Sequence, residues 1–193
     1  MDDELYVLIA GSRTCEDIDF IFEDLDAIFE KNKFNKLYNN ITIVTGNANG
    51  VDAIGNQYAY NRNYDLIMMP ANWGKFGKQA GFIRNERMHL LIAAQKNRAV
   101  ICYKDIDSSG RGTMHSIDLC ERYKNPLLWN EIKNEGGIWR VTHREIFRYK
   151  NNNYENFRFD NPDSQSIIDR IKNVGSKKIN PLRYLNEGYN AKL

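Results

Sequence analysis

The chain has 193 residues, of which 42% are hydrophobic and 27% are charged, so it is long enough for one globular domain with a hydrophobic core. Its formal net charge of +2 argues against a strongly nucleic-acid-binding surface, which usually needs a clustered excess of Lys and Arg. No apolar run reaches the length of a membrane span, and the acidic opening Asp2-Asp3-Glu4 is unlike a signal peptide. We therefore expect a cytoplasmic protein without a membrane partner.

The cysteines and histidines point to no redox or metal chemistry. Cys15, Cys102 and Cys120 form no close pair, and two of them lie in apolar patterns, which predicts buried, reduced thiols. The three histidines are scattered and show no metal-ligand spacing. We expect no metal and no cofactor.

Apolar runs alternate with glycine-bearing loops and amphipathic segments along the first two thirds of the chain. The expected strands are residues 5–10, 41–45, 66–69 and 99–103, with a short fifth strand at 127–129. The expected helices are residues 16–31, 51–62, 83–94 and 114–123. This alternation predicts an α/β fold, doubly wound around a mostly parallel sheet with helices on both faces.

The pattern changes near Glu135. Residues 138–149 and 154–159 alternate in the manner of a β-hairpin, residues 163–174 have helical spacing, and the remainder is polar. We therefore predict a domain at residues 1–134 and a C-terminal hairpin and helix extension at residues 135–193.

Four glycine loops, at Gly11, Gly46, Gly74 and Gly110, should meet at the carboxyl edge of the sheet, where open α/β sheets bind ligands. Two of them, residues 46–50 and 110–113, open directly into helices. Backbone N–H groups and the helix dipole at such a junction suit a phosphate, although ordinary turns explain the same glycines. Neither loop has the spacing of a Walker A or a dinucleotide-binding motif.

The loop after the third strand adds cations and an aromatic ring to the expected site. Arg84 and Asn85 begin a helix beneath a loop that contains Lys78. Arginine can hold a phosphate with two hydrogen bonds, and asparagine can read a sugar or a base. Trp73 either stacks on a base or pins its loop to the sheet, and His115 is more often a passive helix residue than a ligand.

Several segments in this order resemble the YspA-like branch of the SLOG superfamily, over about residues 5–125. They are Gly11-Ser12-Arg13, the run from Thr45 to Asp52, Pro70-Ala71-Asn72-Trp73, Gly77-Lys78-Gln79-Ala80-Gly81, Arg84-Asn85 with Met88, and Gly110-Arg111-Gly112-Thr113. The resemblance implies a Rossmann-like fold and a nucleotide or nucleotide-derived ligand. The superfamily includes the Lonely Guy-type phosphoribohydrolases, ligand-sensing domains of antiphage systems and a single-stranded-DNA-binding protein of natural transformation.

Residue by residue, the resemblance favours ligand binding over hydrolysis. It implies that Gly110, Gly112 and Thr113 hold a phosphate and that Arg84 is the functional arginine of the phosphoribohydrolases. Ser116 stands where their catalytic glutamate lies, and the proline that opens their motif is missing. If the chain is an enzyme, Asp52 is the candidate to replace the lost acid.

We therefore predict a module that senses or sequesters a nucleotide. The alternative is an enzyme that cleaves or transfers the N-glycosidic bond of a nucleotide, with Arg84 and Asp52 as catalytic residues. The third hypothesis is single-stranded nucleic-acid binding by Trp139, Arg140, Arg144, Phe147, Arg148 and Tyr149. By analogy with the hydrolases we also expect a homo-oligomer. The predicted ligand-binding residues are Gly11, Ser12, Arg13, Gly46, Asn47, Gly50, Asp52, Trp73, Lys78, Arg84, Asn85, Gly110, Arg111, Gly112 and Thr113.

Overall fold

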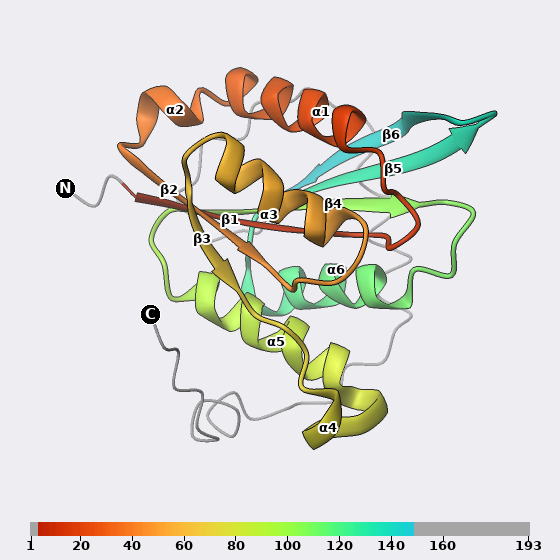
Figure 1. The fold of residues 1–193 in the computed structure, drawn as a ribbon. Helices are drawn as coiled ribbons and strands as arrows, with labels where there is room; N and C mark the ends of the chain where they lie inside the picture. The colour runs from red at the N-terminus through yellow and green to blue at the C-terminus, as the bar shows by residue number, and fades with distance from the viewer. Residues whose placement is uncertain (1–3, 149–193) are drawn as a thin grey trace.

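The structure is a computed structural model that describes residues 4–148 (Figure 1). Its first half contains β1 (Glu4–Gly11), α1 (Ile18–Lys31), α2 (Phe34–Leu37), β2 (Asn40–Thr45), α3 (Val51–Asn61) and β3 (Asp65–Met68). Its second half contains α4 (Trp73–Phe76), the 3-10 helix η1 (Gly77–Gln79), α5 (Ala80–Ala93), β4 (Arg98–Asp105), α6 (Arg111–Tyr123), β5 (Leu127–Glu135) and β6 (Ile138–Phe147). None of the described helices is long and apolar enough to cross a membrane.

The strands form one sheet in the order β3-β2-β1-β4-β5-β6, with β6 alone antiparallel to its neighbour. Helices α1 and α3 cover one face and α5 and α6 cover the other (Figure 1). The order reverses between β1 and β4, so the loops after these two strands diverge and leave a crevice at the carboxyl edge. The predicted doubly wound α/β fold is confirmed.

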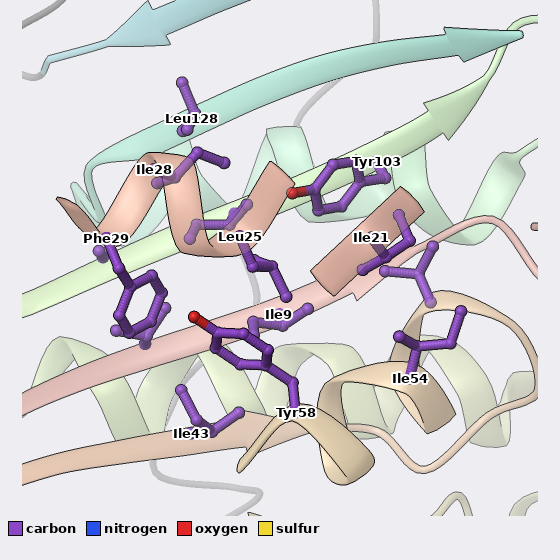
Figure 2. Packing of buried hydrophobic residues seen from close by; sticks show 14 of the residues in the cluster. Ile9, Ile21, Leu25, Ile28, Phe29, Ile43, Ile54, Tyr58, Tyr103 and Leu128 are labelled. Carbon is purple, nitrogen blue, oxygen red and sulfur yellow. The ribbon is translucent and has the colours of Figure 1, made fainter. Parts of the chain in front are cut away.

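The core on the first face forms where the apolar stripe of α1 meets α3 and the sheet (Figure 2). Asp17 caps α1 by accepting a 3.0 Å hydrogen bond from the Phe20 N–H. Phe29 of α1 and Tyr58 of α3 lie edge to face, with ring centroids 5.5 Å apart. The ring contact holds α1 against α3.

The second face is smaller and positions α5 and α6. Met88 of α5 and Ile117 of α6 belong to a buried cluster with Leu8 and Val100 of the sheet. The three cysteines are free and buried, as predicted. Burial raises the pKa of the Cys15 thiol to about 11, which keeps it protonated.

The C-terminal hairpin is real but differs in its pairing from the one that we predicted. Strand β6 pairs with β5, and β5 runs six residues beyond the expected short strand. Gly136 and Gly137 join the two strands with positive φ angles of 64° and 91°. The expected strand at residues 154–159 and the helix at residues 163–174 lie outside the described residues. Because β6 joins the main sheet, the division between residues 134 and 135 stays a prediction.

Candidate functional site

A cavity of about 370 Å³ opens at the carboxyl edge of the sheet, between the β1 loop, the start of α3, α5 and the start of α6. It lies at the crevice between β1 and β4 that the strand order creates. The predicted residues that line it are Gly11, Ser12, Arg13, Asp52, Arg84, Asn85, Gly110, Arg111, Gly112 and Thr113. Segments that are far apart in the sequence therefore meet at one place.

A buried ion pair forms one wall of the cavity. Nη1 of Arg84 lies 3.3 Å from Oδ2 of Asp52, and their side chains are 10% and 5% exposed. The Gly11 N–H donates to Oδ1 of Asp52 at 3.3 Å. Burial raises the pKa of Asp52, against the opposing effects of Arg84 and of backbone N–H groups. Burial likewise lowers the pKa of Arg84.

Three predicted residues in the loop before α3 do not line the cavity, but two of them shape its wall. A Cβ atom on Gly46 would lie 1.4 Å from Nη1 of Arg84, so only glycine leaves room for this guanidinium. Gly50 has a φ of 74°, and a Cβ there would lie 2.4 Å from the Ser12 carbonyl oxygen. Asn47 is exposed and accepts a 2.8 Å hydrogen bond from the Asn56 side chain, which steadies the loop.

The start of α6 forms the opposite wall and has the features of an anion site. Gly110 precedes the helix with a φ of 48°, and the first turn contains no acidic residue. The Asn85 amide donates a 3.1 Å hydrogen bond to the Gly112 carbonyl and thereby fixes the first turn of α6 against α5. Free backbone N–H groups, the helix dipole and the nearby Arg111 all favour a negatively charged ligand here.

The loop between β4 and α6 is tied to the β1 loop by polar contacts that our sequence reasoning missed. Thr14 donates a 2.5 Å hydrogen bond to the Asp105 carboxylate, and the Ser12 hydroxyl accepts from the Asp105 N–H at 2.9 Å. The buried Lys104 ammonium donates to the carbonyls of Asp105 and, at 2.7 Å, of Ser108. The cavity-lining residues absent from our prediction are Ala10, Thr14, Ala48, Ser108, Ser109 and Ser116.

The structure does not bring Trp73 or Lys78 to the cavity. Both are exposed, on α4 and η1, and no residue of α4 is buried. The stacking of Trp73 on a base stays a prediction. His115 packs its ring against Phe82 with centroids 4.9 Å apart and does not line the cavity. Glu86 accepts hydrogen bonds from Arg122 and Tyr123, so it lies in a structural network.

The hairpin residues proposed for nucleic-acid binding have largely structural contacts. Trp139 is partly buried against the core on the α1 face, and Phe147 is 5% exposed. Arg144 forms an ion pair with Asp24 of α1 and donates a 2.6 Å hydrogen bond to Asn130. Arg140 and Arg148 are exposed, and Tyr149 lies outside the described residues. This surface offers few free rings for stacking on bases.

Comparison with known proteins finds a family model that matches the N-terminal part of the fold. Residues 5–76 match the model of the YAcAr family, described as the YspA, cpYpsA-related SLOG family. This segment runs from β1 through α4. The resemblance is therefore confirmed over this range, whereas its continuation toward residue 125 stays a prediction. The curated proteins and the solved structures contain no significant match.

Proposed function

We propose that this chain, whose residues 5–76 match the model of the YspA, cpYpsA-related SLOG family, binds a nucleotide or a nucleotide-derived ligand as a sensor or sequestering module. The phosphate would lie at the start of α6, where Gly110 to Thr113 offer backbone N–H groups. The rest of the ligand would extend across the cavity toward Asp52 and Arg84.

The observation that carries this proposal is the combination of charge and helix geometry in one cavity. Three arginines (Arg13, Arg84 and Arg111) and one carboxylate (Asp52) line the cavity, which gives a formal balance of three positive charges against one negative charge. The start of α6 adds the positive end of a helix dipole without an acid to cancel it. A phosphate-bearing ligand of small size complements this balance.

Binding without turnover is supported by the way in which the carboxylate is held. Asp52 accepts hydrogen bonds from Gly11 and from Arg84, its only ion-pair partner among the described residues. No other Asp or Glu among the described residues lines the cavity. The hydrogen bonds to its two oxygens commit this carboxylate to holding Arg84 and the Gly11 backbone, whereas a general base must be positioned to accept a proton from water.

The test is mass spectrometry of small molecules released by denaturing the purified chain, before and after incubation with a mixture of nucleotides. We expect an intact nucleotide and no free base. Arg111→Ala should weaken nucleotide binding by about 10-fold or more, because it removes a charge-assisted contact without breaking a buried pair. Lys36→Ala, an equal loss of charge at an exposed position of α2, is the matched control. If the chain neither retains nor binds any nucleotide, the proposal is contradicted.

A second candidate, N-glycosidic cleavage, is favoured by one observation. Burial raises the pKa of Asp52, and a raised pKa is a property of carboxyl groups that exchange protons with substrates. Under this alternative, free base accumulates with time and Asp52→Asn abolishes its release while the nucleotide still binds. Base release by the Asp52→Asn variant at the wild-type rate would exclude Asp52 as the acid.

A further inference from the structure

Two polar groups on the buried side of the cavity have no hydrogen-bond partner within residues 4–148. They are the hydroxyl of Ser116, a residue that is 1% exposed, and Nε of Arg84. Both residues line the cavity, Ser116 from α6 and Arg84 from α5. Buried donors without a partner are rare and costly in folded proteins, so each such group needs an explanation.

The helix itself does not use the Ser116 hydroxyl. A serine inside a helix commonly donates to the carbonyl oxygen four residues earlier, which here is Gly112. The Gly112 carbonyl already accepts a 3.1 Å hydrogen bond from Nδ2 of Asn85. The side-chain amide of Asn85 on α5 thus takes the place that the hydroxyl would otherwise fill, and the buried hydroxyl is left without a partner among the described residues.

The contacts that hold the Arg84 guanidinium leave its Nε–H without a hydrogen-bond partner among the described residues. Its Nη1 atom faces Asp52 at 3.3 Å, and Gly46 packs so closely against it that a Cβ atom there would overlap. The ion pair and this close packing together fix the orientation of the guanidinium. Arginine carries donors only, so Nε can be satisfied only by an acceptor atom.

We propose that the Ser116 hydroxyl and Nε–H of Arg84 form a second subsite, separate from the start of α6, that binds an acceptor oxygen of the ligand. The inference rests on the proposed function, because it assumes that a nucleotide enters this cavity. Two chemical sources of that oxygen fit: a second phosphoryl group or a keto oxygen of the base. A ligand that places an amino group at this point leaves Nε–H facing another donor and is rejected.

The test is calorimetric titration of the full chain with three probes: AMP, IMP and ADP. IMP differs from AMP by a keto oxygen in place of an amino group, and ADP differs by one phosphoryl group. We expect the wild-type chain to prefer IMP or ADP over AMP. Ser116→Ala should lower the affinity for the preferred probe by about 10-fold and leave the affinity for AMP nearly unchanged.

The variants identify the source of the oxygen and separate the two proposals. If Ser116→Ala loses the preference for IMP over AMP, the subsite binds a keto oxygen. If it loses the preference for ADP over AMP, the subsite binds a phosphoryl oxygen. Thr142→Ala, which removes a hydroxyl from an exposed position of β6, is the control and should change no affinity. If the wild-type chain binds and Ser116→Ala binds each probe as tightly as the wild-type chain does, the subsite is overturned. If the wild-type chain binds none of the probes, the proposed nucleotide binding itself is contradicted.

Discussion

The N-terminal ends of α3 and α6 have similar sequences, but a carboxylate of the protein lies in the first turn of α3 and none lies in the first turn of α6. Each helix follows a strand and a glycine-bearing loop, and both junctions are expected to suit phosphate. At α3, the N–H of Val51 bonds to the Ser12 carbonyl at 3.3 Å, and the Asp52 carboxylate is buried against the surrounding backbone. At α6, the first turn has no acid, and Gly112 and Thr113 line the cavity.

The difference shows that a glycine loop before a helix is not sufficient to identify an anion site. The positive end of a helix dipole is stabilised by any nearby negative charge, including one from the protein itself. Asp52 supplies that charge at α3, where it also forms an ion pair with Arg84 in the cavity wall. The α6 junction has no such internal anion, so a ligand can take this role. Substitutions at the α3 junction should therefore change stability, and substitutions at the α6 junction should change ligand binding.

The largest effect should come from breaking the buried pair at the α3 junction. Arg84→Ala leaves the Asp52 charge buried without its partner, and we expect a loss of about 3–5 kcal/mol in the free energy of unfolding. Arg62→Ala removes an exposed partner of Asp26, with 37% and 44% of the two side chains accessible, and should cost less than about 1 kcal/mol. Urea unfolding of both variants gives the comparison.

The double variant Arg84→Ala with Asp52→Asn tests the reason for that loss. It replaces the stranded charge by a neutral amide, so part of the stability should return. A double variant as unstable as Arg84→Ala alone would contradict the assignment of the loss to an uncompensated charge.

Gly46→Ala should have the next largest effect, again on stability. The new methyl group would lie 1.4 Å from Nη1 of Arg84 and would force the guanidinium away from Asp52. Overpacking of this kind costs about 1–3 kcal/mol. Thermal unfolding measures the loss, and unchanged stability would mean that Arg84 has another position with equally good contacts.

The pH dependence of stability should report Asp52 and thus the α3 junction. Burial raises the pKa of this carboxyl in the folded state. Its contribution to stability is therefore fully present below the unfolded-state pKa of about 3.9 and is lost as the pH rises through the folded-state pKa. The difference in unfolding free energy between the wild-type chain and Asp52→Asn should fall with rising pH, by at most about 1.4 kcal/mol per pH unit. A difference that grows with pH would mean that Arg84 outweighs burial.

The sequence predicts the fold well because the fold depends on local patterns. Alternating apolar runs and helical stripes locate the first four strands and their helices within a few residues, and the glycines locate the carboxyl-edge loops. The length of β5 was missed because its apolar run ends at Trp129. The polar residue that follows, Asn130, is buried and satisfied by Arg144 and the Cys102 carbonyl, which are distant in sequence.

The site was predicted only in part because its geometry depends on distant pairs. Their places beside the glycine loops and the family resemblance suggested Arg84 and Asp52, but their contact joins residues 32 positions apart and has no local signature. Spacing also placed Trp73 beside Arg84, whereas α4 has no buried residue and Trp73 is 52% exposed. The free hydroxyl of Ser116 follows from a hydrogen bond between α5 and α6, which no sequence pattern displays.

The smallest effect on stability, but a clear effect on binding, should come from Gly112→Ala at the α6 junction. A Cβ atom at Gly112 meets no atom within 4 Å, and alanine in a helix is favoured over glycine by about 0.5–1 kcal/mol. We therefore expect unchanged or slightly higher thermal stability. The same methyl group would stand in the cavity where the phosphate approaches the backbone, so nucleotide affinity should fall by about 10-fold or more. Gly74→Ala on exposed α4 is the matched control and should leave affinity unchanged. Wild-type nucleotide affinity in Gly112→Ala would mean that the phosphate does not bind at the start of α6, and that the two junctions do not differ in ligand binding.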